Sequence, residues 1–201
     1  MEIAIYLEGG GNDSAEAKAS LRQGMSEFLK PEQARQRRTR WRVVPCGGRK
    51  EAFDAFMNAM QEEPDVFNVL LVDSETAVAA QPRAHLKNRD GWDLNAVSED
   101  SVHLMAQCME TWLVSDPEAL SGYYRKDFNA NALPKRMNLE EEPKTSIYSA
   151  LEAATKDTQK GSYGKIAHGS ALLKLIDAKK VKTRCPHCQR LFETITRKVS
   201  E

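Results

Sequence analysis

The chain has 201 residues, with 29 basic and 29 acidic side chains, and so a formal net charge of zero at pH 7. Hydrophobic residues make up 41% and charged residues 29%, a balance that excludes a chain disordered throughout. No apolar run approaches the roughly 20 residues that a membrane-spanning helix needs, and no signal-peptide pattern is present. We expect a cytoplasmic α/β protein without a membrane partner.

The charges are unevenly distributed along the chain. Residues 30–50 hold eight basic side chains against one acidic one, and residues 179–198 hold seven against one. Residues 51–118 hold 14 acidic and three basic side chains. Such blocks are most often solvated faces. The block from Arg35 to Arg42, with Trp41 inside it, suits either a nucleic-acid backbone or an exposed edge strand protected against aggregation.

The first half of the sequence alternates strand and helix patterns. Apolar runs predict strands at residues 3–8, 41–44 and 66–72, the second stopped by Pro45 and the glycines after it. An amphipathic helix follows the first strand, with Asp13 as its N-cap and with Pro31 at or just beyond its end. A second helix covers Phe53 to Met60. This alternation predicts a Rossmann-like parallel sheet flanked by helices.

The second half becomes mainly helical. Residues 76–100 are polar and predict a long loop, and residues 102–107 predict a fourth strand. A helical stripe then begins at Met109 and is interrupted near Asp116 and Pro117. Further helices are expected from Pro143, near Tyr163 and after Pro186. We therefore divide the chain into an α/β core, residues 1–120, and a helical extension, residues 121–201, packed on that core.

Acidic residues follow two of the predicted strands. Glu8 ends the first strand and precedes three glycines, while Asp73 and Glu75 come just after the third strand. Ligands of open parallel sheets bind at the carboxyl ends of the strands, and strands one and three can be neighbours. Three carboxylates there would repel one another unless a cation joined them, and Mg²⁺ or Mn²⁺ is the expected ion. The alternative is ordinary loop acids beside a glycine-rich tight turn.

These acidic strand ends resemble the TOPRIM domain shared by topoisomerases, primases and the nucleases allied to overcoming-lysogenization-defect proteins. The resemblance implies that Glu8 acts as general acid or base and that Asp73 binds metal. Glu75 stands where a second aspartate is expected, a departure that keeps the carboxylate but lengthens its reach.

The chain as a whole is similar to a small bacterial family with TOPRIM-like character. The segments that carry this resemblance are residues 7–11, 71–75, 108–112, 116–117, 142–144 and 163–165 with His168. The resemblance implies a neighbouring AAA or SMC-like ATPase as partner and a role in defence against mobile elements.

Four later residues are candidates for the same site. Glu110 follows the fourth strand and supplies either a further catalytic acid or a surface helix residue. Lys144 opposes the dipole of its own helix start, which favours phosphate contact or an ion pair with the acids before it. Lys165 and His168 are three residues apart, share a helix face, and could bind phosphate or form a surface pair.

The motif Cys185-Pro186-His187-Cys188 invites a zinc or redox interpretation. A structural zinc site needs four ligands, and no second pair with suitable spacing is present. We interpret the motif as a helix start with proline at an early position.

The leading hypothesis is a Mg²⁺-dependent nuclease or other phosphodiester-processing enzyme, with Glu8, Asp73, Glu75 and Glu110 as catalytic acids and the first three as metal ligands. Nucleic acid is the expected partner, with DNA favoured over RNA. The alternatives are a non-catalytic regulatory subunit of an ATPase complex and a nucleotide-binding protein. The sequence leaves the oligomeric state open.

Overall fold

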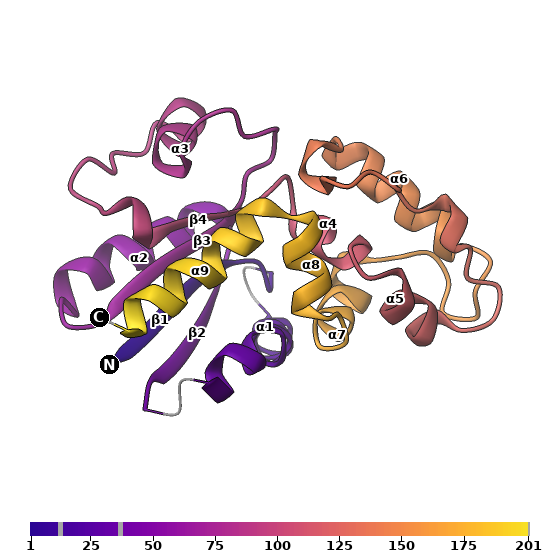
Figure 1. Ribbon diagram of the computed structural model, residues 1–201, viewed down its shortest axis with the longest axis horizontal. Helices are drawn as coiled ribbons and strands as arrows, with labels where there is room; N and C mark the ends of the chain where they lie inside the picture. The colour runs from indigo at the N-terminus through magenta and orange to yellow at the C-terminus, as the bar shows by residue number, and fades with distance from the viewer. Residues whose placement is uncertain (12–13, 36–37, 201) are drawn as a thin grey trace.

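The computed structural model describes residues 1–11, 14–35 and 38–200 and contains one parallel four-stranded sheet (Figure 1). Its strands are β1 (Glu2–Glu8), β2 (Arg40–Gly47), β3 (Phe67–Asp73) and β4 (Val102–Met105), in the order β2-β1-β3-β4. β1 pairs directly with β3, so the first and third strands are neighbours as expected. The chain has the predicted α/β fold.

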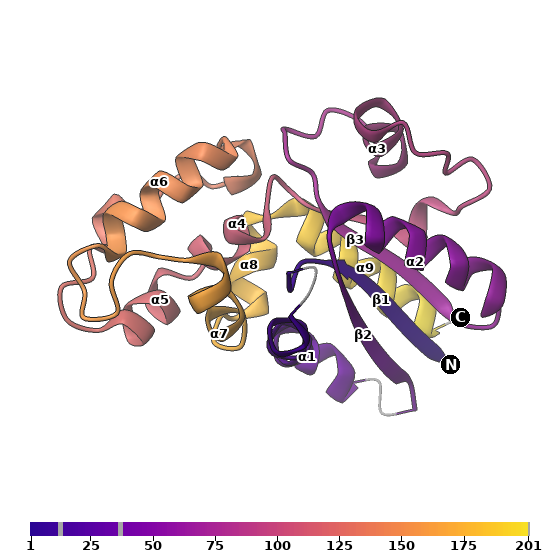
Figure 2. The ribbon, with the colours of Figure 1, turned by 180° about the vertical axis from the view of Figure 1, so that it is seen from behind.

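Helices cover both faces of the sheet. The helices α1 (Ala15–Arg35) and α9 (Pro186–Ser200) lie on one face, and α2 (Arg49–Glu62) and α3 (Pro82–Asp90) lie on the other (Figures 1 and 2). β1 alternates between the two cores: Ile5 packs with the α1 and α9 side, and Tyr6 packs with the α2 side. This period of two is the expected pattern for a strand buried on both faces.

The remaining helices gather beyond the carboxyl ends of the strands, on the right of Figure 1. They are α4 (Met109–Val114), α5 (Pro117–Tyr124), α6 (Lys144–Thr155), α7 (Ser170–Leu173) and α8 (Ala178–Arg184). Short turns of 3₁₀ helix lie at Glu99–Ser101, Ala130–Ala132 and Leu139–Glu141.

Aromatic packing joins the helical region to the sheet. The ring of Phe28 from α1 stacks on Trp112 from α4, with centroids 5.3 Å apart, and meets Phe192 from α9 edge-on at 5.7 Å. Gly24 of α1 allows α7 to approach closely, because a Cβ there would lie 2.7 Å from the carbonyl oxygen of Ser170. These contacts fix the helices that surround the ends of the strands.

Two predicted element ends are wrong. α1 continues through Pro31 to Arg35, where Glu32 is buried and accepts a hydrogen bond from Thr196 Oγ1 of α9 (2.9 Å). β2 continues through Pro45 to Gly47. Because β2 is an edge strand, the missing N–H of a proline need not cost a ladder hydrogen bond.

The predicted long loop and the last helices also need correction. Residues 76–100 contain α3, whose buried residues are Pro82, His85 and Leu86, too few for a clear apolar periodicity. The helix expected near Tyr163 starts at Lys165, and α8 was not predicted.

Some sequence predictions fall outside the described residues. The N-cap assigned to Asp13 and the Arg37 position of the basic block belong to this group. Arg40 and Arg42 lie on the edge strand β2, where Arg42 pairs with Glu63 and Glu2. Within the described parts of the chain, every helix is too short or too polar to cross a bilayer.

Candidate metal centre

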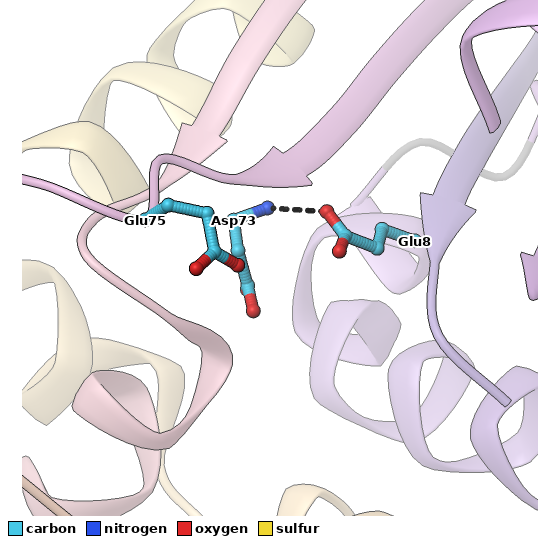
Figure 3. Close-up of side chains that lie close together, drawn as sticks. All are labelled: Glu8, Asp73 and Glu75. Carbon is cyan, nitrogen blue, oxygen red and sulfur yellow. Dashed lines mark hydrogen bonds between the residues drawn. The ribbon is translucent and has the colours of Figure 1, made fainter. Parts of the chain in front are cut away.

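Three carboxylates meet at the carboxyl ends of β1 and β3. One oxygen each from Glu8, Asp73 and Glu75 lies within 4.8 Å of the others. Figure 3 shows Asp73 and Glu75 side by side, with Glu8 facing them from the neighbouring strand. The sequence-based expectation that these residues come together is confirmed as geometry, because adjacent parallel strands end at the same edge of the sheet.

Asp73 is the buried centre of this cluster, with 1% of its surface exposed. Its Oδ1 accepts the backbone N–H of Met109 (2.9 Å), and its own N–H donates to Glu8 Oε2 (3.2 Å). Burial raises the pKa of the Asp73 carboxyl to about 7, with Glu8 and Glu110 adding to the rise and Lys165 opposing it. A buried carboxylate beside other carboxylates favours a cation in its surroundings.

Glu75 is held in an unusual backbone conformation. Its φ of 68° lies in the left-handed region, which residues other than glycine seldom adopt. The Glu75 N–H donates to the carbonyl of Gln107 (2.8 Å), and Lys144 Nζ donates to Glu75 Oε1 (2.7 Å). Such strain persists where surrounding contacts fix the residue, and it is concentrated at functional sites.

Two lysines reach the carboxylates from the helical region. Lys165 Nζ lies 3.5 Å from Asp73 Oδ2, and Lys144 Nζ lies 3.9 Å from the same atom. Burial disfavours both ammonium groups, but nearby carboxylates outweigh it and raise the pKa of each lysine. The sequence therefore identified two cations of the site, which the structure pairs with Asp73 and Glu75.

The expected ion pair between Lys144 and the acids before it does not form. Arg136 pairs with Glu141 and Glu142, while His187 pairs with Glu140. The chain turns those three glutamates away from the start of α6, and Lys144 extends toward β3 instead.

Arg49 is a residue of this site that sequence reasoning missed. Its Nη1 donates to Glu8 Oε2 (3.1 Å) and to the Asp73 carbonyl oxygen, while its Nε and Nη2 donate to Asp90 at 3.0 and 2.8 Å. The guanidinium carbon of Arg49 lies over the Trp92 ring, 5.1 Å from the ring centroid. Arg49 is 41 residues from Glu8 in sequence, and its place just after a glycine pair at a strand end was the available signal.

Glu110 is fully buried, so its interpretation as a surface helix residue is wrong. The Tyr163 hydroxyl donates to Glu110 Oε1 (3.0 Å), whereas Oε2 is buried without a hydrogen-bond partner among the described residues. The Glu110 charge acts on both Asp73 and Lys165. Glu110 therefore belongs to the same electrostatic network as Asp73 and Lys165.

His168 does not share a face with Lys165. Residues Lys165–Gly169 form a π-helical turn, whose wider spacing separates positions that an α-helix would align. His168 Nδ1 accepts the Gly164 N–H (3.0 Å), and its ring packs against Tyr123 and Tyr124. The structure thus places Lys165 at the carboxylates and His168 among aromatic rings.

The cysteine motif begins a helix, as predicted. α9 starts at Pro186, and the side chains of Cys185 and Cys188 are buried. Cys185 Sγ contacts Ser115 Oγ at 3.2 Å, and burial raises the pKa of the Cys185 thiol to about 12. Over residues 1–11, 14–35 and 38–200, the carboxylates of Glu8, Asp73 and Glu75 are the only cluster with metal-ligand spacing.

A family model described as a domain of unknown function, DUF4276, matches residues 7–196. The chain belongs to the DUF4276 family. The matched range contains every residue of the candidate metal centre, from Glu8 to Lys165. Neither the curated proteins nor the solved structures gave a match.

Proposed function

We propose that this chain is a Mg²⁺-dependent nuclease or another phosphodiester-processing enzyme of TOPRIM-like character. The observation that carries the proposal is the cluster of Glu8, Asp73 and Glu75 oxygens within 4.8 Å at the ends of adjacent strands. Lys144 and Lys165 beside it supply the positive charge that a phosphate group needs. A nucleic acid, with DNA favoured, is the proposed substrate.

The ligand set suits a hard divalent cation. All donors are carboxylate oxygens, which Mg²⁺ and Mn²⁺ prefer. Two oxygens on one Mg²⁺ lie at most about 4.2 Å apart, so a small rotation of the partly exposed Glu8 or Glu75 side chain would complete the site.

Each residue of the site has a separate proposed role, set by its position. Asp73 and Glu75 would hold the ion, which when bound stabilises charge developing on a phosphoryl group. Glu8, fixed by Arg49, is placed to accept or deliver a proton or to share the ion. Lys144 and Lys165 would bind phosphate oxygens. Glu110, held by Tyr163, would position Lys165 through its charge.

Cleavage by the purified chain tests this proposal. Plasmid DNA and structured RNA are incubated with Mg²⁺, with Mn²⁺ and with EDTA, in the presence and absence of a neighbouring ATPase. We expect metal-dependent cleavage that Glu8→Gln and Asp73→Asn each reduce by more than about 100-fold, since even residues that only orient metal ligands cost 10–100-fold. Glu62→Gln, on the exposed end of α2, is the matched control. Full cleavage by both site variants would refute the assignment.

One observation favours a second function, a non-catalytic regulatory subunit of an ATPase complex. Each clustered carboxylate already has a cationic partner within the chain: Glu8 with Arg49, Asp73 with Lys165, and Glu75 with Lys144. A self-neutralising network can be purely structural. Stable association with an AAA or SMC-like ATPase, without metal binding in calorimetry and without cleavage, would support this function. A role in anti-phage defence is proposed for either case, from the family resemblance.

A further inference from the structure

A small pocket opens beside the candidate metal centre. Its volume is about 220 Å³, and Glu8 and Lys165 belong both to its lining and to the cluster of charges. The rest of the lining is mostly apolar and includes Ala17, Leu21 and Met109. A ligand in this pocket would therefore touch the Glu8 carboxylate, the Lys165 ammonium group and apolar side chains.

The glycine-rich turn after β1 forms one wall of this pocket. Gly9, Gly10 and Gly11 all have positive φ, and a Cβ on Gly10 would lie 2.9 Å from Lys18 Cγ and 3.0 Å from Lys18 Cα. The turn is therefore pressed against the first turns of α1, and side chains at Gly9 or Gly10 would collide with that helix. The glycines let the loop stay thin, which keeps the pocket open next to Glu8.

The π-helical turn Lys165–Gly169 also contributes to the lining, through Lys165 and Ile166. Ile166, 81% exposed, lies at the rim of the pocket. Its neighbour Lys165 reaches Asp73, so the rim and the charged end of the pocket are consecutive residues. An apolar side chain this exposed, next to a site lysine, is suited to contact a bound ligand.

We propose that this pocket receives one unpaired nucleobase of a single-stranded substrate, with the adjoining phosphate at the carboxylates and lysines. This inference rests on the proposed function and names its substrate class. The pocket is smaller than the roughly 300–1,000 Å³ that holds drug-sized ligands, so it takes one base and not a base pair. A duplex would have to extrude a nucleotide to fill it, and single strands avoid that cost.

The pocket lining also predicts weak sequence preference. Its polar side chains among the described residues are Glu8, Lys165 and Ser170, and the first two are engaged with the charged site. Apolar contact tolerates any base, whereas hydrogen-bond readout of base edges needs more donors and acceptors. We expect selection for unpaired nucleotides and little selection among the four bases.

Binding of short labelled oligonucleotides tests this inference. Fluorescence anisotropy compares single strands of about ten nucleotides, as DNA and as RNA, with a blunt duplex of the same sequence, all in Ca²⁺. We expect single strands to bind at least about tenfold more tightly than the duplex. Preference for the DNA or the RNA strand then identifies the sugar that the site accepts.

Two substitutions on α1 distinguish the effect of filling the pocket from the general effect of adding a large side chain to the helix. Ala17→Phe fills the pocket, and Ala19→Phe places the same side chain on an exposed position of the same helix. We expect Ala17→Phe to weaken single-strand binding about tenfold or more and Ala19→Phe to leave it unchanged. If Ala17→Phe does not fold, Ile166→Ala at the exposed rim replaces it, with a smaller expected loss.

Metal binding is followed separately through the Mn²⁺ EPR signal. This measurement distinguishes failure of the pocket assignment from failure of the proposed metal-dependent function. Unchanged oligonucleotide affinity in the pocket variants, or equal affinity for duplex and single strand, overturns the pocket assignment even when Mn²⁺ binds and cleavage depends on Asp73. Loss of oligonucleotide affinity with unchanged Mn²⁺ binding supports it. Absence of oligonucleotide binding in the unaltered chain overturns it whatever the metal result.

Discussion

The strand ends and the segment of α8 and α9 both gather chemically reactive side chains, yet they are built in opposite ways. At the strand ends, Glu8 and Glu75 keep 18% and 25% of their side chains exposed, and Glu110 carries an unpartnered oxygen. In the segment of α8 and α9, Cys185 and Cys188 are fully buried. Two of the three clustered carboxylates are therefore partly exposed, whereas the two thiols are enclosed.

This contrast indicates which of the two sequence motifs supports a chemical interpretation. Burial raises the pKa of Cys185, so its reactive thiolate form is scarce at neutral pH. The carboxylates at the strand ends come from two neighbouring strands and have cationic partners, and Glu8 lines a pocket. Accessible charged groups that converge from several elements distinguish a candidate site from a packed core.

The largest expected effect lies in the closed segment. Leu191→Ala removes a fully buried side chain of α9 and should lower the free energy of unfolding by about 2–5 kcal/mol. Urea unfolding followed by circular dichroism measures the change, with Glu193→Ala on the exposed face as the control. The affinity for Mn²⁺ should not change in the folded variant. A loss below about 1 kcal/mol would show that the segment is not the tightly packed core described here.

The pH dependence of the free energy of unfolding tests the packing of α9 against β4, through the buried His103. His103 Nδ1 accepts a hydrogen bond from Arg190 of α9 (3.0 Å), and burial, with Arg190 adding to it, lowers the pKa of His103 from 6.5 to about 3. Between these values the unfolded chain binds a proton that the folded chain does not. The contribution of His103 to the free energy of unfolding should therefore fall as pH drops below 6.5, by up to about 1.4 kcal/mol per pH unit, whereas Asp73, with its raised pKa, contributes in the opposite direction.

His103→Gln removes that contribution and should lower the slope of the free energy of unfolding against pH, between pH 6.5 and 5, by up to about 1.4 kcal/mol per pH unit. The measurement is the urea midpoint and free energy of unfolding at several pH values, compared between the two proteins. An identical slope in both would mean that His103 is protonated in the fold and that the region is open to water.

A smaller effect, on Mn²⁺ affinity, is expected from substitution of Lys165 at the strand ends. Its ammonium group pairs with Asp73 and opposes a second cation there, so Lys165→Met should tighten Mn²⁺ binding about two- to fivefold, the range of partly exposed ion pairs. The same variant should weaken oligonucleotide binding. Lys156→Met, on an exposed position, is the control, and weaker Mn²⁺ binding in Lys165→Met would contradict the account.

Much of the fold follows from local patterns. The apolar runs of β1 and β3 and the glycines after Glu8 give the strands and their ends, and the rule for parallel sheets brings those ends together. The polar helix α3 escaped prediction because it buries few residues. The predicted helix end at Pro31 was wrong because Glu32 makes a tertiary contact with α9, and α1 continues past the proline.

The site was predictable only in part. Acidic residues at strand ends can be recognised in sequence, since their position carries meaning. The role of Arg49 depends on where α2 starts relative to β1, and the separation of Lys165 from His168 depends on a π-helical turn. Neither geometry leaves a periodic trace in the sequence, so long-range partners of Glu8 and Asp73 emerge from the structure.

Mn²⁺ binding followed by EPR tests the central claim, that the strand-end carboxylates form a divalent metal site, most directly. The unaltered chain and the Cys185→Ser/Cys188→Ser variant should each bind Mn²⁺, whereas Asp73→Asn should lose more than about tenfold in affinity. Equal Mn²⁺ affinity in Asp73→Asn, or loss of binding in the cysteine variant while it remains folded, would contradict the account.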